Sequence, residues 1–200
     1  MVFHTLALDN FEGAYVEFGV ASGNSLQGAL IANKTKFKSL NIKTIKRKFH
    51  GFDTFEKFTS KNDDDTHEIW SGDKFSFPYE EVKKRFINYQ DVKLIKTDCS
   101  NLNHKENGLF LDEIIKEDIA IVLFDMDLKE PTLEALNWVK PKLKTGTILI
   151  FDELFGFLGQ EELGENGALK EFREANKNIG FREFKKYGCG GVAFQITIRN

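Results

Sequence analysis

The chain has 200 residues, of which 41% are hydrophobic and 30% are charged, and this composition predicts one globular domain over residues 1–200 with a sizeable core. The formal net charge of −3 gives no general attraction to nucleic acid or to an anionic membrane, and no apolar run approaches the roughly 20 residues of a membrane span. The N-terminus lacks the pattern of a signal peptide, and the two cysteines form neither a metal-binding spacing nor a disulfide framework, which predicts a cytoplasmic protein.

Strands and helices are predicted to alternate along most of the chain. An apolar strand over 14–20 is followed by a glycine turn and a helix over 25–34. Further strands are predicted over 49–53, 92–98, 119–125 and 146–153, and further helices over 78–89, 109–117, 131–143 and 165–178. Such alternation implies right-handed crossovers and a mostly parallel sheet with helices on both faces. The last two strands, 181–188 and 191–198, have no helix between them, so we expect them to form a hairpin with one strand antiparallel to the rest.

Two segments do not fit this alternation. Residues 34–48 are basic, but their lysines are interleaved with apolar side chains, which favours an amphipathic, solvated helix over a nucleic-acid-binding surface. Residues 54–78 follow no regular pattern and contain the acidic run NDDD. An irregular segment of this length beside a site is typical of a lid or of a wall of the acceptor pocket, and we expect an insertion of that kind here.

The predicted parallel strands end in acids or in a glycine turn. These residues are Gly19 and Gly23, then Asp53, Asp98, Asp125 with Asp127, and Asp152 with Glu153. The carboxyl ends of parallel strands meet at one edge of the sheet, where open α/β proteins bind their ligands. A single aspartate could instead cap a helix, and this alternative stays open for Asp127. Five strand ends of the same kind favour a ligand site.

The first turn, EFGVASGNS over residues 17–25, carries glycines spaced four apart and not the G-x-G-x-x-G pattern that brings backbone against a pyrophosphate. The chain has no P-loop either. Asp53 ends the second strand, where a carboxylate can accept two hydrogen bonds from a ribose diol. This pattern indicates a nucleoside-bearing cofactor without a bound diphosphate, which S-adenosylmethionine fits better than a nicotinamide dinucleotide.

Four segments carry a family resemblance: EFGVASGNS, HGFDTFEKF, DMDLKEPTLEALNWVKPKLKTGTILIFDEL and ENGALKEF. They resemble the macrocin O-methyltransferase (TylF-like) family of class I S-adenosylmethionine-dependent methyltransferases. The resemblance runs from about residue 13 to the final strand and is most specific over residues 124–153. It implies a Rossmann-like class I methyltransferase sandwich, an α/β fold whose seven-stranded, mostly parallel sheet ends in an antiparallel hairpin.

The resemblance also implies roles for the residues at the strand ends. Glu17, Gly19 and Gly23 would line the methionine end of the cofactor, Asp53 would hold the ribose, and Asp98 with Cys99 would lie beside the adenine. Relatives that methylate hydroxyls use a divalent metal, normally Mg²⁺, and its ligand positions match Asp125, Asp152 and Glu153. The metal would lower the pKa of the substrate hydroxyl, and Asp127 is the first candidate to take its proton. Asp125 and Asp127 are therefore the catalytic candidates.

These expectations combine into an S-adenosylmethionine-dependent methyltransferase that uses Mg²⁺ to methylate a hydroxyl of a small molecule such as a sugar or a glycan precursor. Two alternatives remain: a nicotinamide-dependent oxidoreductase on a Rossmann-like sheet, and a non-catalytic cofactor-binding protein. The glycine pattern and the final hairpin argue against the oxidoreductase. We expect a small-molecule acceptor and neither nucleic acid nor membrane as a partner, and assembly into a homo-oligomer stays open.

Overall fold

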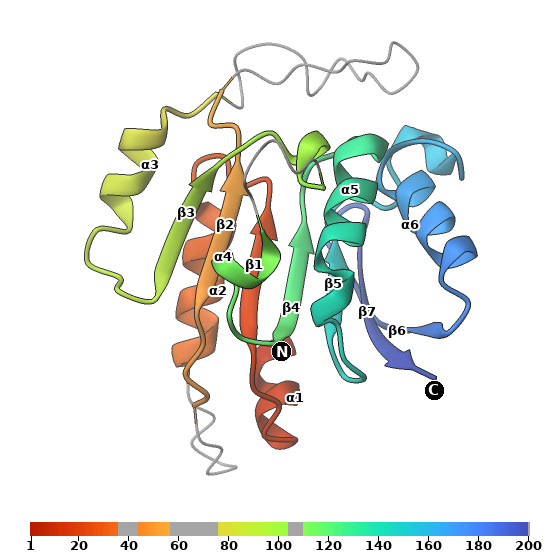
Figure 1. The fold of residues 1–200 in the computed structure, drawn as a ribbon, viewed down its shortest axis with the longest axis horizontal. Coiled ribbons are helices and arrows are strands. Elements are labelled where there is room, and N and C mark those ends of the chain that lie inside the picture. Colours follow the sequence, from red (N-terminus) through yellow and green to blue (C-terminus); the bar gives the residue numbers. More distant parts are fainter. Residues whose placement is uncertain (36–43, 57–75, 104–109, 200) are drawn as a thin grey trace.

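The computed structural model describes residues 1–35, 44–56, 76–103 and 110–199 (Figure 1). The amphipathic helix predicted over 34–48 and the insertion predicted over 54–78 lie mostly outside these residues, because 36–43 and 57–75 are not described. The same holds for residues 104–109, at the start of one predicted helix.

Seven strands form one sheet in the order β3-β2-β1-β4-β5-β7-β6. Their bounds are β1 (Ala14–Phe18), β2 (Phe49–Asp53), β3 (Val92–Lys96), β4 (Ile119–Phe124), β5 (Ile148–Phe151), β6 (Ile179–Tyr187) and β7 (Gly191–Ile198). The first five strands are parallel, whereas β7 pairs antiparallel with both β5 and β6. The predicted seven-stranded sheet with a C-terminal hairpin is therefore confirmed. The strand order reverses between β1 and β4, and ligands of open α/β sheets bind at such a switch point.

Helices cover both faces of the sheet (Figure 1). Their bounds are α1 (Val2–Leu8), α2 (Asn24–Lys34), α3 (Tyr79–Arg85), α4 (Leu111–Ile114), α5 (Lys129–Val139) and α6 (Gly164–Ala175). One hydrophobic cluster takes buried residues from α1, α2 and α3, among them Leu6, Leu26 and Val82. A second cluster takes Leu136 from α5 and Phe172 from α6 on the opposite face. The sheet is thus sealed on both sides, and β4 is buried along its whole length.

Some element boundaries differ from the sequence predictions. Helix α1 was not predicted, and the helix predicted over 109–117 is described only as the single turn α4. Strand β1 ends at Phe18 and not at residue 20, because Gly19 adopts a φ of +88° that leaves the extended conformation. Helix α5 begins at Lys129, two residues before Pro131; a proline in the first turn is tolerated because its missing N–H has no partner there.

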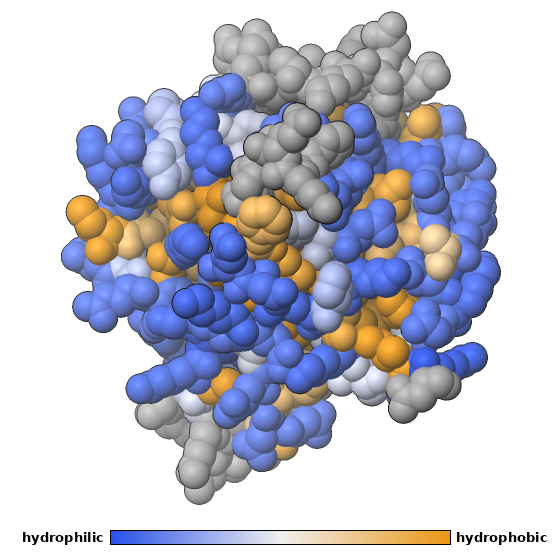
Figure 2. All heavy atoms as spheres, viewed as in Figure 1, coloured by the Kyte–Doolittle hydropathy of each residue, from blue (hydrophilic) through white to orange (hydrophobic). Residues whose placement is uncertain are grey.

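The surface differs from the interior in polarity. Figure 2 shows hydrophilic side chains over much of the face seen in Figure 1, with apolar side chains in smaller areas between them. Among the described residues, no helix combines the length and the hydropathy needed to cross a membrane. The large apolar side chains lie mainly in the two clusters that pack against the sheet.

Candidate active site at the carboxyl ends of the strands

Four neighbouring strands end in the same way, with a buried phenylalanine followed by an aspartate or a glycine. The pairs are Phe52-Asp53, Phe18-Gly19, Phe124-Asp125 and Phe151-Asp152. The strand register aligns the four phenylalanines across the sheet. Their ring centroids are 5.0, 5.7 and 4.9 Å apart in this order, so the rings form one stacked row. The row lies on the face of the sheet that α5 and α6 cover, and Phe18 and Phe52 pack against Trp138 of α5.

The residues after these phenylalanines therefore lie at one level of the sheet. The backbone N–H of Gly19 donates to the carbonyl of Phe52 at 2.9 Å, and the N–H of Asp125 donates to the carbonyl of Phe18 at 2.9 Å. The N–H of Asp152 continues this ladder by donating to the carbonyl of Phe124 at 3.1 Å. Asp125 and Asp152 consequently stand on adjacent strands, which are separated by about 4.8 Å in a β-sheet. The structure thus places Asp125 and Asp152 beside one another at the strand ends.

The glycine turn after β1 lies tightly against the end of β4. A Cβ added to Gly19 would lie 1.7 Å from the carbonyl oxygen of Asp125, so only glycine permits this approach. Gly23 has a φ of +81° and is the N-cap residue of α2. Asp53 joins this turn to the end of β2, because its Oδ2 accepts a 2.7 Å hydrogen bond from the Ala21 N–H. Its Oδ1 accepts a second bond, also of 2.7 Å, from the Phe55 N–H.

Glu17 lies under the glycine turn and is completely buried. The hydroxyls of Tyr15 and Ser25 each donate to its carboxylate, at 2.6 Å. Burial raises the pKa of Glu17 to about 7, although these two hydrogen bonds favour the ionised form. Sequence reasoning missed Tyr15 and Ser25. The usable signals were weak: Tyr15 is two residues before Glu17 on one strand face, and Ser25 begins a helix.

Asp98 and Cys99, predicted to lie beside the adenine, form a turn after β3. Asp98 caps the 3₁₀ turn Cys99–Asn101: its carboxylate accepts 2.9 Å hydrogen bonds from the Ser100 N–H and the Asn101 Nδ2. The Asp98 side chain thus shapes its own loop, which is the capping role common for aspartate. Cys99 is buried in the hydrophobic cluster beside α5, and burial raises the pKa of its thiol.

Asp125 is the centre of a group of carboxylates. Its pKa is raised to about 8, mainly by burial and then by the negative charges of Asp152, Asp127, Glu17 and Glu153, in that order. Asp127 stands two residues beyond the strand with a φ of +62°. The N-cap residue of α5 is Leu128, so Asp127 does not occupy the capping position that the sequence left open for it.

The carboxylates are suitable ligands for a divalent cation, but they are not arranged around one position. Among the described residues, no three His, Cys, Asp or Glu side chains form a group that could hold a metal ion. Yet every charged neighbour that raises the pKa of Asp125 is itself a carboxylate. Buried like charges need a proton or a cation for compensation, and carboxylate oxygens are the ligands that Mg²⁺ prefers. Asp125, Asp152 and Glu153 therefore provide suitable donors without being gathered into one cluster.

Two further polar residues at this edge were not found from the sequence. Tyr187, on β6, donates its hydroxyl to the carbonyl of Phe151 at 3.1 Å, and burial together with the charge of Asp152 raises the pKa of this phenol. Glu165, on α6, is 1% exposed, and its Oε2 accepts a 3.0 Å hydrogen bond from the Glu153 N–H. A signal for Glu165 existed: it shares a helix face with the apolar residues three, four and seven positions later.

Comparisons with known proteins agree with this fold. The family model of macrocin-O-methyltransferase (TylF) matches residues 1–180. The O-methyltransferase NovP superposes with a TM-score of 0.70 at 21% identity, covering 98% of this chain and 76% of that chain. The calicheamicin methyltransferase CalS11 superposes with a TM-score of 0.67 at 24% identity, covering 97% and 75%. The mycinamycin-pathway methyltransferase MycE, solved with Mg and SAH, has a TM-score of 0.54 at 14% identity, covering 98% and 48%. No curated protein matches the sequence.

Proposed function

Because the chain belongs to the macrocin O-methyltransferase (TylF) family and is an S-adenosylmethionine-dependent methyltransferase, we propose that it methylates a hydroxyl of a small molecule, such as a sugar, at the acidic strand ends. One observation carries the proposal: four adjacent strands end at the same level of the sheet. The residues at these ends are Asp53, Gly19, Asp125 and Asp152. A cofactor site and an acidic acceptor site are then neighbours. A sugar acceptor is supported by CalS11, which is described as a TDP-rhamnose 3'-O-methyltransferase.

The cofactor would lie over the ends of β1, β2 and β3. The turn from Gly19 to Gly23 binds its methionine end, with Glu17 beneath this turn, and Asp53 accepts hydrogen bonds from the ribose. The Asp53 carboxylate is suited to this role because the Ala21 and Phe55 N–H groups hold it in place and it is only partly buried. The loop of Asp98 and Cys99 lies next along the sheet and borders the adenine. Bound S-adenosylmethionine supplies a methyl group on a positively charged sulfur.

The acceptor would bind beyond β4 and β5. Asp125, Asp152 and Glu153 would hold Mg²⁺, a proposal supported by their donor chemistry and by the Mg present in the MycE structure. Bound Mg²⁺ would lower the pKa of the acceptor hydroxyl and so favour its reaction. Asp127, beside these ligands, would take the proton of the acceptor hydroxyl at its carboxylate.

Family membership sets aside the two alternatives considered from the sequence. A nicotinamide-dependent oxidoreductase and a non-catalytic cofactor-binding protein are both inconsistent with an S-adenosylmethionine-dependent methyltransferase. The proposed acceptor remains a hydroxylated small molecule and not a nucleic acid. The segment proposed as a lid or acceptor wall, 54–78, lies mostly outside the described residues.

The proposal is tested by binding and by turnover. Titration calorimetry should detect S-adenosylhomocysteine, and a panel of nucleotide sugars should reveal a Mg²⁺-dependent release of S-adenosylhomocysteine. Asp125→Asn and Asp152→Asn should abolish Mn²⁺ binding, followed by electron paramagnetic resonance, whereas Glu171→Gln on the exposed side of α6 should leave it intact. Absence of S-adenosylhomocysteine binding at every Mg²⁺ concentration would refute the cofactor site. Unchanged methylation in both aspartate variants would refute the metal.

A further inference from the structure

Glu165 is a buried carboxylate that has no part in the proposed reaction. It lies in the first turn of α6 and is 1% exposed. Its helix face otherwise carries Ala168, Leu169 and Phe172, which are all buried in the hydrophobic cluster of that side. An ionisable group on such a face is costly unless its contacts compensate for the lost hydration. The contacts of Glu165 therefore indicate why a carboxylate occupies a core position.

The carboxylate of Glu165 lies between the chain segments that follow β4 and β5. Its Oε2 accepts a 3.0 Å hydrogen bond from the N–H of Glu153, in the segment after β5. The N–H of Met126, in the segment after β4, also faces this carboxylate and favours its ionised form. Oε1 is buried and has no hydrogen-bond partner among the described residues, while the charges of Asp125 and Asp127 act on the same group. One side chain thus bridges the two segments that carry the proposed metal ligands.

The backbone at the start of α6 closely approaches the segment after β4 and the segment that leads into the helix. A Cβ added to Gly164 would lie 3.0 Å from the carbonyl oxygen of Asp127 and 2.7 Å from the ring of Phe157. A Cβ added to Gly167 would lie 2.4 Å from the carbonyl oxygen of Glu162. The glycines at these two positions permit backbone contact that larger residues would prevent.

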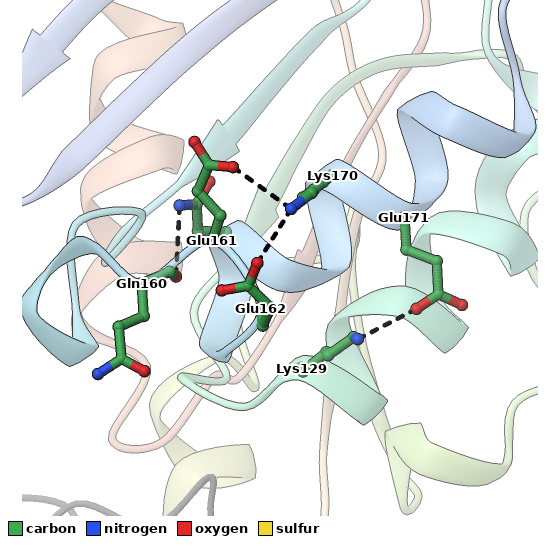
Figure 3. Close-up of polar contacts among 7 residues, drawn as sticks. Lys129, Gln160, Glu161, Glu162, Lys170 and Glu171 are labelled. Carbon is green, nitrogen blue, oxygen red and sulfur yellow. Dashed lines mark hydrogen bonds and ion pairs between the residues drawn. The ribbon is translucent and has the colours of Figure 1, made fainter.

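Ion pairs connect α6 to neighbouring parts of the chain (Figure 3). Lys170 on α6 contacts Glu161 at 3.3 Å and Glu162 at 3.1 Å, in the segment that leads into the helix. Lys129, the first residue of α5, contacts Glu171 on α6 at 3.1 Å. These pairs are partly exposed, so each contributes little to stability. The two pairs of Lys170 connect α6 to the segment that leads into it, whereas the pair of Glu171 lies further along the helix.

We propose that Glu165 is a positioning residue that fixes the distance between the segments after β4 and β5, from which Asp125, Asp152 and Glu153 would reach one cation. This inference rests on the proposed function, because it concerns the same metal site. The glutamate side chain is long enough for its carboxylate to accept these backbone hydrogen bonds from α6. A shorter carboxylate cannot extend as far, and a negative charge alone does not replace the hydrogen bonds.

Two conservative variants distinguish the effect of side-chain length from the effect of charge. Glu165→Gln keeps the length and one acceptor oxygen, which can receive the Glu153 N–H, and its amide group can face the acids from the position of the unpaired Oε1. Glu165→Asp keeps the charge but is one carbon shorter. Mn²⁺ binding to the full chain is measured by electron paramagnetic resonance, S-adenosylhomocysteine binding by calorimetry, and the melting temperature by circular dichroism. Glu171→Asp, on the same helix and exposed, is the matched control for the shortening.

We expect Glu165→Asp to weaken Mn²⁺ binding by about tenfold or more, as is typical when a group that orients metal ligands is altered. Glu165→Gln and Glu171→Asp should bind Mn²⁺ almost as the wild type does, and all three variants should retain S-adenosylhomocysteine affinity. The inference is overturned if Glu165→Asp binds like the wild type, or if Glu165→Gln is the weaker of the two, which would indicate a role for charge. It is equally overturned if Mn²⁺ and S-adenosylhomocysteine affinities fall together with the melting temperature. A wild-type protein that binds S-adenosylhomocysteine but no Mn²⁺ would remove the metal from the proposed function, and this inference with it.

Discussion

Replacement of Glu17 by glutamine should change how the stability of the protein depends on pH. Burial raises the pKa of Glu17 to about 7 in the folded protein, against an ordinary value of 4.5. Between these two values the folded state holds a proton that the unfolded state has released. Glu17 therefore contributes stability that is complete below about pH 4.5 and is lost as the pH rises through about 7. A glutamine at this position does not titrate and lacks this dependence.

The size of the effect follows from the shift. Between about pH 5 and about pH 8 the wild-type protein should lose about 2–3 kcal/mol of unfolding free energy through this one group. The Glu17→Gln variant should escape that loss, so its stability relative to the wild type should rise by the same amount over this interval. The variant also loses an acceptor for the hydroxyls of Tyr15 and Ser25. That cost is largely independent of pH and cancels when the two pH values are compared.

Urea unfolding of both proteins at the two pH values, without cofactor, measures the difference. Glu171→Gln serves as the surface control, because its side chain is 54% exposed. A relative stability of Glu17→Gln that is the same at both pH values, or that falls as the pH rises, would refute the reasoning. The carboxylate would then be ionised in the folded state throughout, held by the Tyr15 and Ser25 hydroxyls.

Three other substitutions test the geometry of the site. Gly19→Ala should destabilise the protein by more than about 3 kcal/mol in thermal unfolding, because its Cβ would lie 1.7 Å from the Asp125 carbonyl oxygen at a φ of +88°. Gly28→Ala, the matched change in α2, should stabilise the protein by about 0.5–1 kcal/mol, since nothing lies within 4 Å of the added Cβ. Asp53→Ala should weaken S-adenosylhomocysteine binding by about tenfold or more in calorimetry, because it removes the proposed ribose acceptor and frees the Ala21 N–H.

Each of these expectations can fail in a recognisable way. A mild effect of Gly19→Ala, comparable to that of Gly28→Ala, would mean that the turn after β1 and the end of β4 separate easily. Unchanged affinity in Asp53→Ala would place the ribose elsewhere, and Mn²⁺ binding measured in parallel would show whether the variant damages the whole strand edge or the cofactor side alone.

Local patterns in the sequence were sufficient for the order of elements and for the acids at the strand ends. A buried strand such as β4 needs a run of apolar residues, and a parallel sheet needs helices between its strands, so both leave a local signature. The final hairpin was visible for the same reason, because no helix separates β6 from β7. The short helix α1 was missed because its apolar pattern spans only seven residues, VFHTLAL, of which Leu6 is buried in the core.

The tertiary structure alone decided which of these acids lie together and how they are held. The phenylalanine row, and with it the common level of Asp125 and Asp152, depends on strand register, which no single strand encodes. The position of Asp127 outside the helix cap depends on a left-handed backbone conformation at one residue. The burial of Glu165 depends on how α6 packs against segments far away in the sequence. Sequence periodicity therefore determined the elements and the kinds of residue at their ends, whereas the distances between those residues arose only when the strands were aligned and the helices were packed.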